Sequence, residues 1–160
     1  MNTDEALELA EKLVKEWTVD RAAPEAGRLD LVLGRPDDLV PAVAALRVQR
    51  LGYLSAITGI DLGPEADRLE ALYHFCTGEA VVTLRVRLPR QGAFVPSLCE
   101  LIPSAGPFER ELREMFGITV VGLSNPEKLY LPEDWPEDEF PLRKDWSPQA
   151  PTTAAGEGGP

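Results

Sequence analysis

The stretch RLEALYHFCTGEAVVTLRVRL, residues 68–88, contains the clearest strand pattern of the chain. In residues 80–88, apolar side chains take alternate positions, which are Val82, Leu84, Val86 and Leu88. A period of two places them on one face of a β-strand and leaves Arg85 and Arg87 on the other. Because Thr77-Gly78-Glu79 separates two strand-like runs, the stretch predicts a hairpin in an antiparallel sheet with one buried face.

Further strands and helices are expected on both sides of this hairpin. Strands are predicted for residues 28–34, 53–60 and 118–121, and helices for residues 3–17, 38–50, 94–101 and 107–116. Thr3 and Asp38 are candidate N-caps, and Gly117 is a candidate C-terminal stop because glycine readily adopts a positive φ. The predicted fold class is α+β, with a mainly antiparallel sheet covered by helices and an extended C-terminal arm.

The chain changes character after Gly122. Residues 123–148 contain several prolines and show no helix or strand period. Three large aromatic side chains stand among the prolines, namely Trp135, Phe140 and Trp146. Disordered segments lack such side chains, so we expect an extended arm that docks on another surface. The sequence thus predicts an α+β domain at residues 1–122, a docking arm at 123–148 and a disordered tail at 149–160.

Composition and charge exclude several classes of partner. The 160 residues are 44% hydrophobic and carry a formal net charge of −11. Nucleic-acid binding requires a basic surface, and anionic lipid attracts basic patches, so neither partner is predicted. We find neither a secretory signal nor a run of about 20 apolar residues. A cytoplasmic protein that reaches a membrane only through partner subunits is therefore expected.

The chain offers few side chains that bind metals or cofactors. Its soft ligands are Cys76, Cys99 and His74, which are too few for an iron–sulfur cluster or a structural zinc site. No glycine-rich nucleotide loop is present. We therefore expect no cofactor and no metal, two buried free thiols, and a structural role for His74.

Two charged segments are candidates for function. Residues 109–114 read ERELRE, and on a helix Arg110 and Glu114 are four positions apart. This spacing favours an ion-pair lattice that fixes the helix against its surroundings. The alternative is a stand-alone carboxylate-dependent metallohydrolase that uses Glu109, Glu111 and Glu114.

The second segment is PLRKDW, residues 141–146, which places a basic pair in an acidic chain. Arg143 can pair in a bidentate manner with a partner carboxylate, and Trp146 can bury itself in a partner surface. The segment is therefore interpreted as an interface motif. A free-standing adaptor domain is a further alternative for the whole chain.

Together the two segments resemble the 30-kDa, or C, subunit family of complex I. Its members carry a helix E-R-E-x-x-[DE]-[ML]-[FY]-G-[IV] and, downstream, L-P-E-D-W and P-L-R-K-D-[FYW]. Here the corresponding segments are ERELREMFGI at 109–118, LPEDW at 131–135 and PLRKDW at 141–146. The resemblance covers roughly residues 53–146. Members usually have His-Pro where this chain has Leu123-Ser124, and LPEDWP is also similar to the homologous subunit of energy-converting membrane-bound nickel–iron hydrogenases.

The resemblance implies a non-catalytic structural subunit in the peripheral arm of an NADH:quinone oxidoreductase-like or hydrogenase complex, without catalytic, cofactor or metal residues of its own. It implies docking on the large hydrogenase-like subunit, beside the small iron–sulfur subunit, on the cytoplasmic side of the cell membrane. Electron transfer coupled to ion translocation would be the work of the whole complex. The residues implied in the interface or structural motif are Glu109, Arg110, Glu111, Glu114, Met115, Phe116, Gly117, Pro132, Trp135, Pro141, Leu142, Arg143, Lys144, Asp145 and Trp146.

Overall fold

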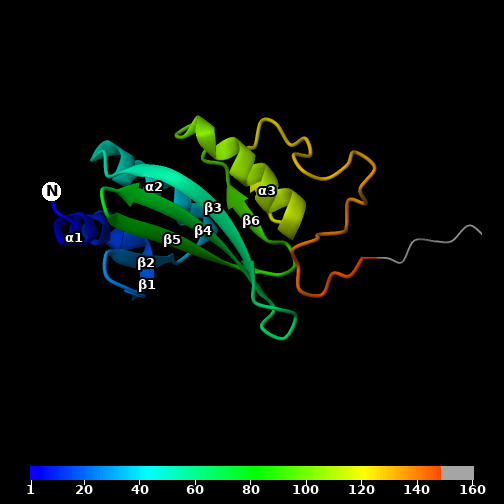
Figure 1. Ribbon diagram of the computed structural model, residues 1–160, viewed down its shortest axis with the longest axis horizontal. Helices are drawn as coiled ribbons and strands as arrows, with labels where there is room; N and C mark the ends of the chain where they lie inside the picture. The colour runs from blue at the N-terminus through cyan, green and yellow to red at the C-terminus, as the bar shows by residue number, and fades with distance from the viewer. Residues whose placement is uncertain (149–160) are drawn as a thin grey trace, which may run out of the picture.

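The computed structural model describes residues 1–148, and the tail predicted for 149–160 lies outside the described residues. The helices are α1 (Thr3–Val14), α2 (Leu39–Val48) and α3 (Gly106–Phe116), with short 3-10 turns η1 (Lys15–Trp17), η2 (Pro36–Asp38) and η3 (Pro103–Ala105). The strands are β1 (Thr18–Ala22), β2 (Arg28–Leu33), β3 (Tyr53–Asp61), β4 (Arg68–Thr77), β5 (Ala80–Pro89), β6 (Phe94–Pro96) and β7 (Thr119–Val121). Figure 1 shows their arrangement, with the arm beyond α3.

A five-stranded sheet in the order β1-β2-β5-β4-β3 forms the centre of the molecule. The β4–β5 hairpin has the predicted register, with Tyr73 opposite Leu84, and the alternate apolar residues of β5 are buried. The α+β fold with a mainly antiparallel sheet is thus confirmed. One pair differs, because β2 runs parallel to β5.

Helices pack on the apolar face of the sheet and complete a single core. The close approach of α3 to β3 depends on Gly59, whose register partner is Ala71 on the apolar face. A Cβ atom at Gly59 would lie 2.4 Å from the Phe116 ring, so only glycine permits this packing. The C-terminal end of α3 is therefore fixed against the edge of the sheet.

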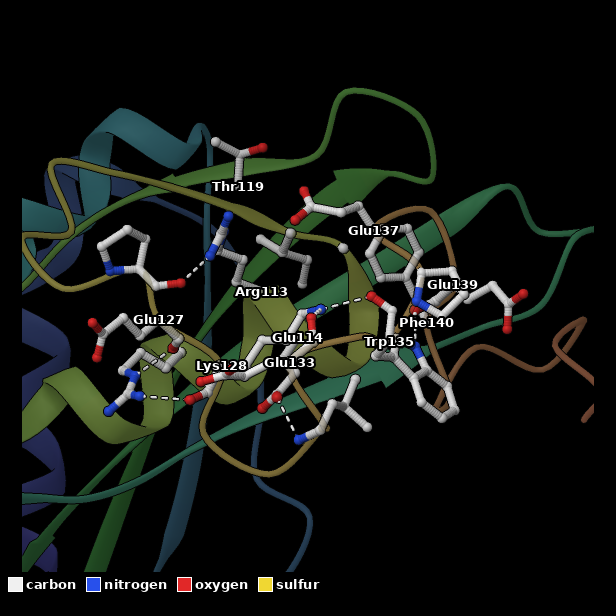
Figure 2. A pocket seen from close by; sticks show the side chains of 16 residues that line it. Arg113, Glu114, Thr119, Glu127, Lys128, Glu133, Trp135, Glu137, Glu139 and Phe140 are labelled. Carbon is white, nitrogen blue, oxygen red and sulfur yellow. Dashed lines mark hydrogen bonds between the residues drawn. The ribbon is translucent and has the colours of Figure 1, made fainter.

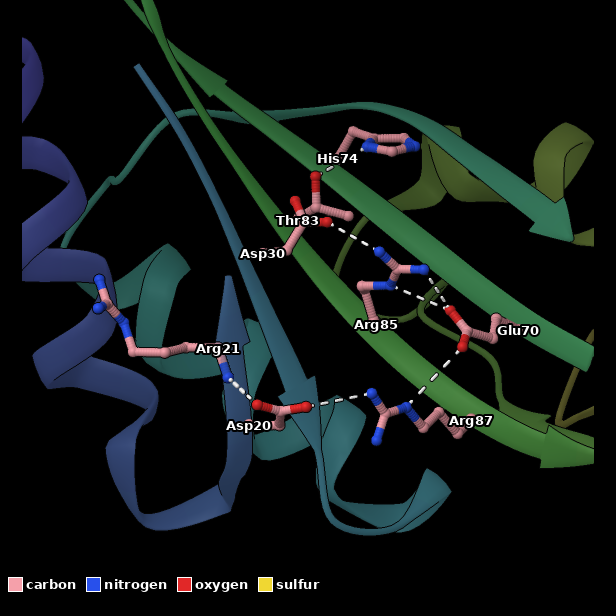
Figure 3. Close-up of polar contacts among 8 residues, drawn as sticks. All are labelled: Asp20, Arg21, Asp30, Glu70, His74, Thr83, Arg85 and Arg87. Atoms are coloured by element: carbon pink, nitrogen blue, oxygen red, sulfur yellow. Dashed lines mark hydrogen bonds and ion pairs between the residues drawn. The ribbon is translucent and has the colours of Figure 1, made fainter. Parts of the chain in front are cut away.

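The opposite face of the sheet carries a polar network (Figure 3). Arg85 lies between Asp30 at 2.9 Å and Glu70 at 2.6 Å. The two ring nitrogens of His74 lie 3.1 Å and 3.0 Å from the hydroxyl oxygens of Thr58 and Thr83. Burial lowers the pKa of His74 below its ordinary value, so the ring stays neutral near pH 7. These contacts agree with the structural role expected for this histidine.

Several boundaries differ from the predicted ones. The first helix ends at Val14 and is capped by Asn2, whose side chain accepts the N–H of Glu5, so Thr3 is not the cap. Asp38 does not cap α2 with its side chain, which accepts the N–H of Arg35 instead. Helical periodicity does not show which backbone N–H group a capping side chain binds, so the caps could not be assigned from it.

Two strands were missed. Residues 94–101 are not a helix: Phe94–Pro96 forms β6, which pairs in parallel with β7 and buries Val95 opposite Val120. β1 escaped detection because most of its side chains are exposed, so no alternation marks it. The thiols of Cys76 and Cys99 are free as expected, but they are half-buried and not fully buried.

Candidate functional site

Helix α3 buries two glutamates, which is costly unless each carboxylate is hydrogen-bonded. Glu109 and Glu114 are both buried, beside Leu112 and Phe116. The helix ends at Gly117, whose φ of 67° confirms the predicted glycine stop. The two buried carboxylates make α3 the candidate functional element of the domain.

Glu109 fixes the loop that precedes the helix. Its side chain is 0% exposed. It accepts the N–H of Leu98 at 2.6 Å and the hydroxyl of Ser97 at 2.6 Å. The thiol of Cys99 also donates to it, at 3.3 Å, and burial together with this carboxylate raises the pKa of that thiol. The carboxylate is thus saturated by its own chain, and the thiol stays protonated.

Glu114 holds the start of the arm. Its two carboxylate oxygens accept three successive backbone N–H groups, which belong to Leu129, Tyr130 and Leu131, with shortest distances of 3.1, 3.0 and 2.6 Å. Hydrogen bonds to an ionised acceptor are about twice as strong as neutral ones. One side chain of α3 therefore fixes the backbone of this part of the arm (Figure 2).

The two arginines of α3 also bind the arm. Arg110 donates to the carbonyl oxygens of Glu127 at 2.7 Å and Lys128 at 2.8 Å, and Arg113 donates to the carbonyl of Pro126. The predicted ion-pair lattice is wrong: within residues 1–148, the ion pairs do not include Arg110, Glu109 or Glu114. The reason is that backbone groups of the arm satisfy Arg110 and Glu114, whereas the loop at residues 97–99 satisfies Glu109.

The three carboxylates of a metallohydrolase are not brought together. Glu109 faces the loop at residues 97–99, Glu114 faces residues 129–131, and Glu111 makes no hydrogen bond or ion pair within the described chain. No group of three or more His, Cys, Asp or Glu side chains in residues 1–148 could hold a metal ion. This alternative has no support in the geometry.

The end of the arm is fastened to the sheet by a cluster that we call the latch, formed by the buried residues Asp61 and Arg90 and the exposed Asp145. Arg90 is 7% exposed, pairs with Asp61 and donates to Asp145 at 2.5 Å. Asp61 also accepts the N–H groups of Gly63 at 2.8 Å and Lys144 at 2.7 Å. Burial alone would raise the pKa of Asp61, but these hydrogen bonds outweigh it and hold the pKa below its ordinary value.

Arg143 and Phe140 add a second attachment next to the latch. Arg143 donates to the carbonyl oxygens of Phe116 at 2.7 Å and Arg90 at 3.2 Å. A Cβ atom on Gly117 would lie 2.6 Å from the Phe140 ring, so the ring packs directly on this glycine. The side of residues 141–146 that faces α3 and the sheet therefore makes its contacts within this chain. Asp61 and Arg90 were not among the predicted site residues, because Asp61 is a single charged residue at the end of β3 and Arg90 a single one just after β5.

Most of the remaining predicted site residues lie at the surface of the arm. The rings of Trp135 and Trp146 are 5.8 Å apart, and their indole N–H groups donate to the carbonyl and the carboxylate of Glu139, respectively. Both rings are partly exposed, as is Pro141, whereas Pro132, Leu142 and Lys144 are exposed, and Met115 packs against the core. These residues leave an outer surface on the arm that no described part of the chain covers.

The structure thus defines an α+β domain that binds its own C-terminal arm through the charged side chains of α3. The sequence matches the family described as respiratory-chain NADH dehydrogenase, 30 Kd subunit, over residues 32–152, and the chain belongs to that family.

Curated relatives support this assignment, and one solved structure shares the fold. The chain is 37% identical over 121 residues to NAD(P)H-quinone oxidoreductase subunit J of Prochlorococcus marinus, covering 70% of this chain and 67% of the relative. It is 34% identical over 111 residues to formate hydrogenlyase subunit 5 of Escherichia coli, covering 67% and 19%. A chain of the membrane-bound sulfane sulfur reductase, an archaeal respiratory membrane complex, has the same fold, with a TM-score of 0.69, 19% identity and coverage of 89% and 86%.

The chain spans about two thirds or less of the length of the curated relatives that it matches. These relatives are subunits of multi-subunit complexes. Among the helices of residues 1–148, none has the length and apolar character required to cross a membrane.

Replacing Glu114 by glutamine is expected to loosen the arm. The variant loses the charge that accepts three N–H groups, and the amide nitrogen of glutamine cannot accept a hydrogen bond. We expect faster hydrogen exchange at the amides of residues 129–131 and a stability loss of about 1–3 kcal/mol. Glu111→Gln is the matched control and should leave both unchanged. Unaltered exchange at 129–131 in Glu114→Gln would contradict this account of the arm.

Proposed function

We propose that this chain is a non-catalytic assembly subunit of a complex I-like or membrane-bound hydrogenase complex. The observation that carries the proposal is the family match, together with the contacts of α3, whose charged side chains bind the arm. Its task would be to present a fixed surface to other subunits and so support their electron transfer.

The surface proposed for this docking is the outer side of the arm and the adjoining β6–β7 pair. Large apolar side chains are exposed here: Phe94, Val121, Tyr130 and Leu142. Tyr130 is 65% exposed and Leu142 50%, although the backbones of both are fixed to α3. Aromatic and aliphatic side chains held rigidly at a surface are typical of the contact points of a protein interface.

The proposed partners are the large hydrogenase-like subunit and the small iron–sulfur subunit of the same complex. The named relatives support this, since both quinone oxidoreductase and hydrogenlyase subunits match this chain. The proposed location is the cytoplasmic side of the cell membrane, held there by the partner subunits. The net charge of −11 favours partner surfaces with basic character.

The docking surface can be tested without unfolding the domain. In a Tyr130→Asp, Leu142→Asp double variant, two exposed apolar side chains become charged, so the melting temperature should change little. Recovery of the large subunit with the tagged chain should fall about tenfold or more, because each such contact contributes 1–2 kcal/mol or more when central to an interface.

Val19→Asp, on β1 at the other end of the molecule, is the control because Val19 is 68% exposed (Figure 1). Its recovery of the large subunit should equal that of the unmodified chain. Equal recovery by the double variant and the control would show that docking uses another surface.

A further inference from the structure

The arm arches over a hollow that its own side chains do not fill (Figure 2). This arm hollow has a volume of about 530 Å³ and lies between α3, the residues that follow Gly117, and residues 126–140. Apolar and aromatic side chains line part of it: Ile118, Leu131, Trp135 and Phe140. A space of this size admits several side chains of another molecule.

The walls of the arm hollow are held in place from both sides. Arg110 and Glu114 bind the backbone of residues 127–131, and Phe140 packs on Gly117. The ammonium group of Lys128 donates to the carbonyl oxygens of Glu133 at 3.1 Å and Trp135 at 2.6 Å. The cavity is therefore preformed, and an occupant would not have to order the arm on binding.

The lining of the arm hollow carries more carboxylates than cations, with five glutamates against two arginines and one lysine. Its cations, which are Arg110, Arg113 and Lys128, all donate to backbone carbonyl groups. The carboxylates of Glu133 and Glu137 form no hydrogen bond or ion pair within the described part of the chain, and both line the hollow. The cations keep their charge but direct N–H groups to the walls, whereas the carboxylates of Glu133 and Glu137 remain for an incoming group.

We propose that the arm hollow receives a segment of a partner subunit that carries lysine or arginine. Such side chains combine an apolar stem with a cationic head, which matches aromatic walls beside free carboxylates. A second copy of this chain is a poor occupant, because two chains of net charge −11 repel each other. The inference rests on the proposed function and specifies the chemistry of the partner surface.

The test uses the full-length tagged chain in its native host, with the photo-crosslinking residue p-benzoylphenylalanine in place of Glu137. The complex is purified, irradiated and digested, and the cross-linked peptides are identified by mass spectrometry. The expected product joins position 137 to a partner-subunit peptide with a lysine or arginine next to the attachment point. The same residue at Glu79, in the exposed β4–β5 turn, is the control and should give no such product.

A charge-reversal variant, Glu133→Lys with Glu137→Lys, gives an independent measure. Recovery of the partner should fall about tenfold at low salt, and less at high salt, because like charges would meet in the hollow. Glu79→Lys should recover the partner normally. A cross-link to a second copy, to a peptide without basic residues, or to nothing would overturn the inference, as would normal recovery by the reversed variant. If the unmodified chain recovers no large subunit at all, the proposed function itself fails.

Discussion

Replacing Glu109 by alanine is expected to lower the free energy of unfolding by about 3 kcal/mol or more. The carboxylate is fully buried and accepts hydrogen bonds from Ser97, Leu98 and Cys99. Its removal leaves the N–H of Leu98 and the Ser97 hydroxyl without their acceptor and opens a cavity beneath the loop. Chemical denaturation of the purified chain, followed by circular dichroism, measures the loss.

Glu111→Ala is the matched control, since it removes an equal carboxylate two residues away on the same helix. Glu111 is partly exposed, and its change should stay within about 0.5 kcal/mol. Equal stabilities of the two variants would show that Glu109 does not fix the loop at residues 97–99.

The second large effect is expected at the latch. Asp61→Asn removes the charge that faces buried Arg90 and turns an acceptor of the Lys144 N–H into an amide, at a cost of about 2–4 kcal/mol. Because the end of the arm is held here, hydrogen exchange at residues 143–146 should accelerate as well. Asp67→Asn, in the same β3–β4 loop but exposed, should leave both quantities unchanged.

The contribution of Asp61 should depend on pH in a defined direction. Its folded-state pKa lies below its ordinary value, so its stabilising contribution is fully present above the unfolded-state pKa of about 3.9. As the pH falls through the folded-state pKa, the carboxyl takes up a proton and the contribution is lost. The stability difference between the unmodified chain and Asp61→Asn should therefore be constant from pH 5.5 to about 8 and shrink below about pH 4. A difference that shrank on raising the pH would contradict the assignment.

The sequence predicted those strands and helices in which apolar residues recur at a regular spacing. Val82, Leu84, Val86 and Leu88 define the buried face of β5, and Gly117 ends α3 as expected. β6 was mistaken for a helix because its three residues are too few to show alternation. β1 was missed because most of its residues are exposed.

The candidate site was predicted in its position but not in its contacts. Helical spacing shows only which side chains are neighbours on α3, whereas Arg110 and Glu114 bind backbone groups 17 residues further along the chain. Backbone N–H and carbonyl groups have no sequence signature, so no pattern could reveal this. Asp61 and Arg90 were missed for a related reason, since the fold alone brings them to Asp145.

The arm illustrates a limit of composition as a guide. Large apolar side chains among prolines require burial, but either the same chain or a partner can supply it. Phe140 and Arg143 pack at the C-terminal end of α3, whereas Tyr130 and Leu142 remain exposed. The predicted boundary between domain and arm at Gly122 stays a prediction, and so does docking on a partner, now assigned to the outer side of the arm.

The most direct test of the central claim is the subunit stoichiometry of the chain in its native membrane. The tagged chain is purified from detergent-solubilised membranes at low salt, and the co-purifying proteins are quantified by mass spectrometry. The predicted result is a complex in which one copy of this chain accompanies one large hydrogenase-like subunit and one small iron–sulfur subunit. Recovery of the chain alone, as a soluble monomer without these subunits, would contradict the claim.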